Sequence, residues 1–192
     1  MIREMNHRVK NLFSVVSAMV SIAGRESDDS QELANSLRNR IHALGKSHAL
    51  TLGQPHDIDR AVFLSELIDT VVAPNLSTQT IEKTGTPLAL SNSQITSLAL
   101  VLHEWATNAT KYGALSVPSG QIEIAWQTED NMIKLTWIET GQMEKPASDP
   151  SVGFGTGLIS AAARQLGGSA TGECTSDGYR RTLTFEDNGV VH

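Results

Sequence analysis

The stretch Gln121–Glu139, QIEIAWQTEDNMIKLTWIE, decides the fold class of this chain. Apolar and polar residues alternate on both sides of its centre, which is typical of two antiparallel strands that each bury one face. The polar residues Glu129-Asp130-Asn131 join the two halves. The stretch therefore predicts a β-hairpin.

The same patterns predict further elements on either side of this hairpin. Apolar residues at helical spacing, or in alternation, predict helices over residues 61–72, 93–112 and 158–166, and strands over 80–84, 169–174 and 181–185. Helices mixed with hairpins indicate an α+β sandwich, in which helices cover one face of a sheet.

Two amphipathic helices are expected before this domain, over residues 1–24 and about 31–52, with a polar connection. Together they form a helical hairpin. Two helices bury little by themselves, so the hairpin needs a partner. A second copy would complete a four-helix bundle, although the apolar stripes could also dock on the chain's own domain or on other segments. We expect a hairpin over 1–55 and an α/β sandwich over 56–192.

Composition narrows the class of protein. The 192 residues are 40% hydrophobic and carry a net charge of −6, which supports a folded core and argues against a general nucleic-acid binder. The single cysteine, Cys174, excludes an internal disulfide, so a reducing cytoplasm fits. No apolar run approaches the roughly 20 residues that span a bilayer. Because the chain begins directly in helix-like sequence, we expect an input domain upstream.

Glycines and one helical face could carry chemistry. Gly153-x-Gly155-x-Gly157 lets backbone approach a phosphate closely before the helix that follows. Glu104, Asn108 and Lys111 share one face of the long helix, where a carboxylate and a carboxamide one turn apart can hold Mg²⁺ against a triphosphate. Each motif alone also fits a plain turn or a solvated helix face.

A third motif stands at the end of the second hairpin strand. Glu139 is followed by Thr140-Gly141, and a carboxylate there can accept a hydrogen bond from an exocyclic amine such as adenine N6. A surface glutamate at a strand end is the alternative, and we expect Trp137 to serve packing.

In this order, the three motifs resemble the N, G1 and G2 boxes of the GHKL ATPase superfamily. His103 directly before Glu104, together with Trp137-x-Glu139, is similar to the residues that name the HWE histidine kinases. Asn6-His7-Arg8-Val9-Lys10-Asn11 resembles the phosphoacceptor box of that family. The resemblance covers residues 4 to 185.

This resemblance implies a sensor histidine kinase core with a GHKL (Bergerat) ATP-binding domain, using ATP and Mg²⁺. His7 would be phosphorylated and would pass the phosphoryl group to an aspartate of a response regulator receiver domain. Asn108 and Glu104 would serve the metal, with Glu104 as a polarising carboxylate. The implied nucleotide-binding residues are Asn108, Lys111, Tyr112, Glu139, Gly141, Gly153, Gly155, Thr156 and Gly157.

Position on the helix also favours His7 as the phosphoacceptor, because it lies away from the apolar stripe and should be exposed. A neutral imidazole is a competent nucleophile near pH 7. The position after it holds Arg8, where many histidine kinases have an acidic residue. We therefore expect Glu4, one turn earlier, to orient the imidazole, and Asn11 to orient a water that dephosphorylates the receiver.

Three other classes of protein compete with this interpretation. An ATP-independent phosphotransfer protein or receiver phosphatase of the same shape would show decay in the boxes, which are intact here. Another GHKL ATPase would not need a hairpin bearing His7. A structural dimerisation module would not need the glycine-rich motif.

Overall fold

The computed structural model describes residues 30–51, 61–77, 79–141 and 154–188 of the chain. Its helices are α2 (Ser30–Thr51), α3 (Leu64–Val72), α4 (Asn92–Tyr112) and α5 (Phe154–Gln165), with 3-10 turns at Ala73–Asn75 and Ala114–Ser116. Its strands are β1 (Val62–Phe63), β2 (Thr80–Thr84), β3 (Ala89–Leu90), β4 (Gln121–Glu129), β5 (Met132–Thr140), β6 (Ser169–Cys174) and β7 (Gly178–Glu186). The predicted α+β class is confirmed.

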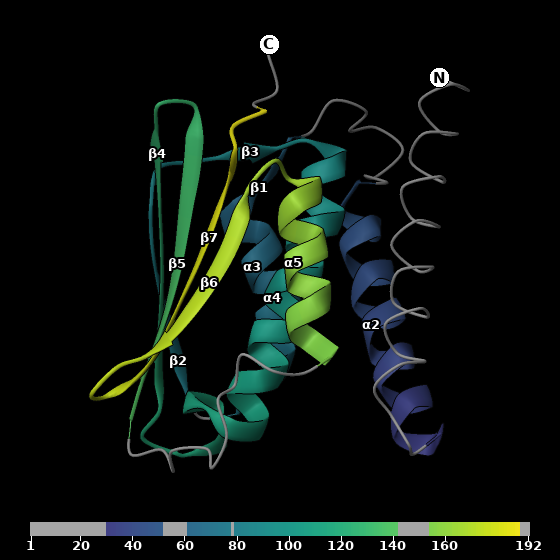
Figure 1. Cartoon of the computed structure of the whole chain (residues 1–192), viewed down its shortest axis with the longest axis vertical. Helices are drawn as coiled ribbons and strands as arrows, with labels where there is room; N and C mark the ends of the chain where they lie inside the picture. The colour runs from purple at the N-terminus through teal and green to yellow at the C-terminus, as the bar shows by residue number, and fades with distance from the viewer. Residues whose placement is uncertain (1–29, 52–60, 78, 142–153, 189–192) are drawn as a thin grey trace.

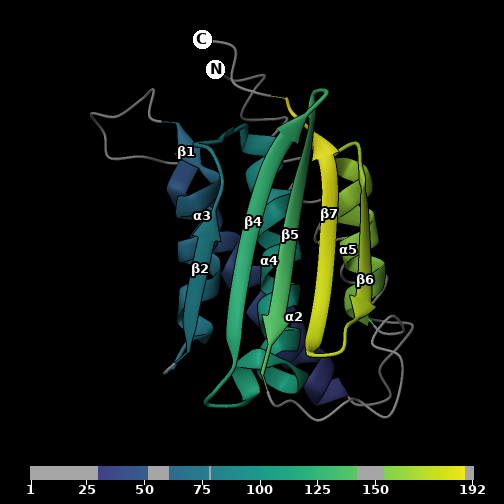
Figure 2. The ribbon, with the colours of Figure 1, turned by 90° about the vertical axis from the view of Figure 1, so that its left-hand side faces the viewer.

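The sheet has five strands in the order β2-β4-β5-β7-β6 (Figure 2). The predicted hairpin is its centre: β4 and β5 pair antiparallel from Gln121 opposite Thr140 to Glu129 opposite Met132. Asp130 and Asn131 make the turn with positive φ angles of 48° and 62°, which these residue types tolerate better than most. The parallel pairing of β2 with β4 was not predicted from sequence.

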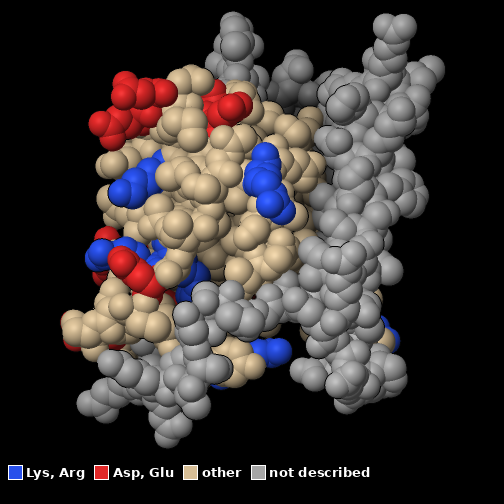
Figure 3. Space-filling view, in the orientation of Figure 1, with Lys and Arg blue, Asp and Glu red and all other residues tan. Residues whose placement is uncertain are grey.

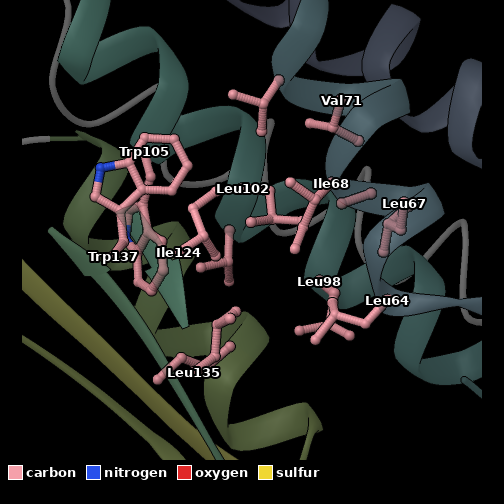
Figure 4. Close-up of a cluster of buried hydrophobic side chains, with 14 of the residues drawn as sticks. Leu64, Leu67, Ile68, Val71, Leu98, Leu102, Trp105, Ile124, Leu135 and Trp137 are labelled. Carbon is pink, nitrogen blue, oxygen red and sulfur yellow. The ribbon is translucent and has the colours of Figure 1, made fainter. Parts of the chain in front are cut away.

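Helices α3, α4 and α5 cover one face of this sheet, and α2 lies on the far side of that helical layer (Figure 1). The strands bury alternate residues, so one face of the sheet is apolar. The core lies between that face and the helices. There Trp105 and Trp137 pack edge to face, with their ring centroids 5.9 Å apart (Figure 4). The same buried cluster contains Leu64, Leu98, Leu102, Ile124 and Leu135, each with an exposed fraction of 0%. This packing fixes α4 against the sheet.

Helix α2 packs against α4 and α3 of its own chain. Leu37 and Leu44 form a small apolar cluster with Leu100 of α4 and Leu158 of α5. Ile41, on the same helix, stays 51% exposed. The docking of α2 on the chain's own domain, one of the alternatives that the sequence left open, is therefore what the structure shows.

The predicted start of α5 is wrong. Sequence analysis placed the glycines in a loop before Leu158, whereas α5 begins at Phe154 and takes Gly155 and Gly157 into its first turn. The first turn of a helix lacks intrahelical partners for its N–H groups, so glycine costs less there than in a helix interior. Short β1 and β3 were also missed, because two residues carry no recognisable period.

Several expectations fall outside the described residues. The helix expected over 1–24 and the first glycine of the glycine-rich motif, Gly153, belong to this group. In the part of the chain that is described, no helix combines the length and apolar character needed to cross a membrane. On the face seen in Figure 3, the charged side chains of the described residues are spread in small groups over a mostly uncharged surface.

Candidate active site

Helix α4 carries the centre of the site, and its ends are well defined. Ser91 caps the N-terminus in a capping box, with its Oγ accepting from the Gln94 N–H while its own N–H donates to Gln94 Oε1 at 2.9 Å. The Gln94 side chain also donates to the carbonyl of Glu186 at 3.0 Å, which ties the helix to the end of β7. A fixed helix of this kind can hold Glu104 and Asn108 one turn apart in a set orientation.

The Glu104 side chain is 3% exposed and forms an ion pair with Arg40 of α2. Arg40 Nε donates to Oε1 at 2.6 Å, and a terminal guanidinium nitrogen donates to Oε2 at 2.7 Å. Two parallel charge-assisted hydrogen bonds of this type fix both oxygens of a carboxylate. Sequence analysis did not identify Arg40. The available signal was an arginine within the apolar stripe of its helix, between Leu37 and Leu44.

Gly155 brings the first turn of α5 against this carboxylate. A Cβ atom at Gly155 would lie 2.9 Å from Glu104 Oε2 and 3.9 Å from Asn108 Nδ2. A side chain at this position would therefore require the Glu104 carboxylate to shift. Thr156 is half-buried beside it and Gly157 is exposed. The structure thus brings together Glu104, Asn108 and Gly155 as the sequence predicted.

His103 lies next to Glu104 and is half-buried. Burial lowers the pKa of this imidazole below its usual value of 6.5, because the charged form loses solvation. The Glu104 carboxylate acts in the opposite direction, and the Arg40 guanidinium adds to the lowering. The pKa of His103 therefore favours a neutral ring beside the ion pair.

Glu139 forms a second buried carboxylate site at the end of β5, with no exposed surface. Trp137 Nε1 donates to its Oε1 at 2.9 Å, and the Ala114 N–H donates to Oε2 at 2.9 Å. The Arg181 guanidinium of β7 pairs with Oε1 as well. Glu139 therefore joins β5 to β7 and to the segment after α4. An adenine amine would have to share a carboxylate that already accepts three hydrogen bonds.

Glycines shape this second site too. A Cβ atom at Gly113 would lie 1.9 Å from Glu139 Oε2, so only glycine leaves room for the carboxylate. Gly141 has a φ of 143°, a conformation that favours glycine, and it lies against the backbone of Gly120. The role expected of Trp137 in packing is complemented by its hydrogen bond to Glu139.

The other predicted residues lie at the margin of the site or outside the described chain. Lys111 and Tyr112 are exposed at the end of α4, with Tyr112 60% exposed. The predicted residues Glu4, His7, Asn11 and Gly153 lie outside the residues that the structure describes. For these four, the roles assigned from sequence stay predictions.

The side chains at the first carboxylate suit a metal–nucleotide complex more than a metal ion alone. The described residues contain no cluster of three His, Cys, Asp or Glu side chains that could hold an ion. Mg²⁺ commonly takes one or two protein oxygens and completes its shell with phosphates and water. Asn108, with Glu104 beside it, supplies an oxygen of the right kind near Gly155.

The fold is that of histidine kinase catalytic domains. The histidine kinase domain of a blue-light activated histidine kinase from Erythrobacter litoralis superposes with a TM-score of 0.63, covering 91% of this chain and 93% of that one at 13% identity. Histidine kinase AdeS of Acinetobacter baumannii superposes with a TM-score of 0.52 over 97% of this chain and 98% of its own, at 14% identity.

Sequence comparison finds similar proteins among the histidine kinases. Residues 4–87 match the model of the HWE histidine kinase family. Blue-light-activated histidine kinase 1 of Erythrobacter litoralis is 35% identical over 186 residues, which is 95% of this chain and 51% of the relative. A blue-light-activated histidine kinase of Rhizobium johnstonii is 31% identical over 88% of this chain and 48% of its own length. The chain is thus similar to the HWE histidine kinases over residues 4–87 and to blue-light-activated histidine kinases over most of its length, and it spans about half the length of these relatives.

Proposed function

We propose that this chain is the catalytic core of a two-component sensor histidine kinase. It would take the γ-phosphoryl group of ATP onto His7 and then pass it to an aspartate of a response regulator receiver domain. One observation carries the proposal: Glu104, Asn108 and Gly155 meet beside the start of α5, while Glu139 and Gly141 form a second buried end on the same domain. We assign the first end to the phosphates of ATP and the second to its adenine.

Each of these residues would have a separate role in phosphoryl transfer. Gly155 would admit the phosphates to the first turn of α5, where backbone N–H groups and the helix dipole favour anions. Asn108 would hold Mg²⁺, whose charge neutralises the phosphates when it is bound, and Glu104 would polarise the reacting groups nearby. Transfer then needs positioning of the imidazole in line with the γ-phosphate. Glu4 would orient His7 for this step.

The finer assignments rest on the family and the sequence. The helical hairpin over 1–55 would present His7 and pair with a second copy, giving a homodimer. Asn11 would serve dephosphorylation of the receiver. The use of ATP and the single exposed Cys174 support a cytoplasmic site of action. The blue-light response named for the relatives is a candidate input for the full-length protein.

The test is incubation with γ-labelled ATP and Mg²⁺. We expect protein-bound label that is lost in acid and stable in alkali, as for a phosphoramidate on histidine, and no label in His7→Gln. Label that survives this substitution would contradict the phosphoacceptor assignment. Absence of both label and nucleotide binding would favour a phosphotransfer protein without kinase activity.

A further inference from the structure

One charged contact connects α2 to the candidate nucleotide site. Arg40 and Glu104 are 64 positions apart in sequence, and both side chains are at most 8% exposed. We propose that Arg40 is a positioning residue of the phosphoryl-transfer site, supplied by the phosphotransfer hairpin and acting through Glu104. This inference rests on the proposed function and adds a residue to its machinery.

The geometry restricts the Glu104 carboxylate in a way that a single contact would not. Each oxygen accepts one hydrogen bond from the same rigid guanidinium, so the plane of the carboxylate follows the plane of Arg40. Oε2, which accepts from the terminal nitrogen, is also the oxygen nearest to the Cβ position of Gly155. Arg40 therefore sets where this oxygen lies relative to the glycine turn.

The docking of α2 involves both helices of the site. Leu37 and Leu44 flank Arg40 along α2, and they pack with Leu100 of α4 and Leu158 of α5. Arg40 thus enters between apolar contacts that hold α2 on the two elements bearing Glu104 and Gly155. A shift of α2 would move the guanidinium and the carboxylate with it. The site is complete only while α2 is docked.

Stability alone does not account for an ion pair at this place. Buried ion pairs seldom stabilise a fold more than apolar residues of similar volume would, because both charges lose their hydration. Leu37 and Leu44 lie near Arg40 along α2 and pack into an apolar cluster, so a hydrophobic side chain is compatible with this part of the helix. An arginine at this position is explained by the orientation that its guanidinium group imposes on the Glu104 carboxylate.

The test compares Arg40→Lys with Arg38→Lys in the full chain. Lysine keeps the charge but offers a point donor in place of a fork. Arg38 is exposed on the same helix and bonds Asn35 at 3.1 Å, so it is the matched control. For Arg40→Lys we expect an autophosphorylation rate at saturating ATP·Mg²⁺ reduced about 10-fold or more, with nucleotide Kd changed less than about 3-fold. Arg38→Lys should behave as wild type.

An active wild type with an equally active Arg40→Lys, or a faster one, would overturn this inference and leave the proposed function intact. A wild type that takes no phosphate from ATP would overturn the proposed function instead, and this inference with it. A rate loss accompanied by an equal loss of nucleotide binding would also count against a positioning role, since it would indicate collapse of the site.

A second set of variants applies even if Arg40→Lys folds poorly. Arg40→Gln, Glu104→Gln and the double variant form a thermodynamic cycle, and the double variant leaves no buried charge unpaired. Because Arg40 acts through Glu104, the double variant should be no slower than Glu104→Gln alone, within about 2-fold. A rate loss in the double variant equal to the product of the losses in the two single variants would contradict the proposal.

Discussion

Glu104 and Glu139 are both buried glutamates paired with an arginine, yet their partners come from different parts of the chain. Glu139 is held by Arg181 from the neighbouring strand β7 and by Trp137 on its own strand. Glu104 is held by Arg40 from α2, a helix outside the sheet and its covering layer. The Glu139 end of the site is thus built into the domain, whereas the Glu104 end depends on the docking of α2.

This difference suggests a division between binding and transfer. Contacts inside the sheet would keep one end of a nucleotide site unchanged through a reaction cycle. Contacts with α2 would let the position of the proposed phosphotransfer hairpin influence the other end, where we propose that transfer occurs. Substitutions at the two ends should therefore have different effects on stability and on rate.

The largest effect is expected at the end built into the sheet. Arg181→Met leaves the Glu139 carboxylate, which has no exposed surface, without its cation. Loss of one partner of a buried pair typically costs about 3–5 kcal/mol. Urea unfolding measures the change. Arg180→Met is the control, because Arg180 is 48% exposed and lies 3.5 Å from an exposed Glu173, so its loss should cost less than about 1 kcal/mol.

A smaller loss is expected where α2 docks. Leu44 is 3% exposed, and Leu44→Ala should destabilise the docked helix by about 2–4 kcal/mol through the cavity it leaves. Because α2 lies outside the main core, thermal unfolding should show an early loss of helix ellipticity while the tryptophan signal of the core persists. A single cooperative transition with both signals would contradict separate stabilities of the two regions.

Ile41 provides the control for this prediction. It is 51% exposed in the structure, so Ile41→Ala should change the stability of the monomer by less than about 1 kcal/mol. If the hairpin pairs with a second copy, the same substitution should shift the monomer–dimer equilibrium toward monomer in analytical ultracentrifugation. An unchanged equilibrium would place any dimer contact elsewhere.

Methyl groups added at two glycines should separate stability from binding. At Gly113 the methyl would overlap Glu139, so Gly113→Ala should cost about 1–3 kcal/mol of unfolding free energy. At Gly155 it would meet the end of the Glu104 side chain, and alanine favours the helix, so the stability should change by less than about 1 kcal/mol. Gly155→Ala should nevertheless weaken nucleotide binding in calorimetry. Equal stability losses at both positions would contradict the comparison.

The smallest effect concerns Tyr179, which is 6% exposed and lies opposite Glu139 on β7. Burial raises the pKa of its hydroxyl, and the nearby Cys174 adds to the rise. Above about pH 10 the unfolded chain loses this proton while the fold holds it, so stability falls as the pH rises further. Tyr179→Phe should reduce that fall. Identical profiles of unfolding free energy for the two proteins between about pH 9 and about pH 11 would contradict this prediction.

At neutral pH the same substitution should be neutral or stabilising by up to about 1 kcal/mol. Among the residues that the structure describes, no group meets hydrogen-bond geometry with the buried Tyr179 hydroxyl, so its removal relieves a desolvation cost. A clear loss of stability would show that the hydroxyl has a partner in solution.

Local sequence patterns predicted most of the helices and strands because these elements depend mainly on residues that are close in sequence. The alternation in Gln121–Glu139 identified the central hairpin, and the helical spacing in α4 placed Glu104 and Asn108 on one face. The predicted start of α5 was wrong because glycines usually indicate loops. Gly155 instead lies in the first turn of the helix, which comes close to the Glu104 carboxylate. The parallel β2–β4 pairing joins residues about 40 apart, which no local period encodes.

The arginine partners illustrate the same limit at the site. Glu104 and Glu139 were both identified from sequence, but neither Arg40 nor Arg181 was, because each reaches its glutamate only after the chain has folded. A buried carboxylate requires a cation, so the sequence implied that partners exist without naming them. The need for glycine at position 113, where α4 ends, likewise comes from the Glu139 carboxylate, which follows 26 residues later in the sequence.

Localisation of the transferred phosphate tests the central claim most directly. The full chain is incubated with ATP and Mg²⁺ under neutral conditions, and phosphohistidine is mapped by mass spectrometry in wild type and in Asn108→Ala. We predict phosphate on His7 in wild type and a loss of at least about 100-fold in Asn108→Ala, because this substitution would remove the metal–phosphate contact that we propose for Asn108. Phosphate on another residue, or full phosphorylation of His7 in Asn108→Ala, would contradict the account.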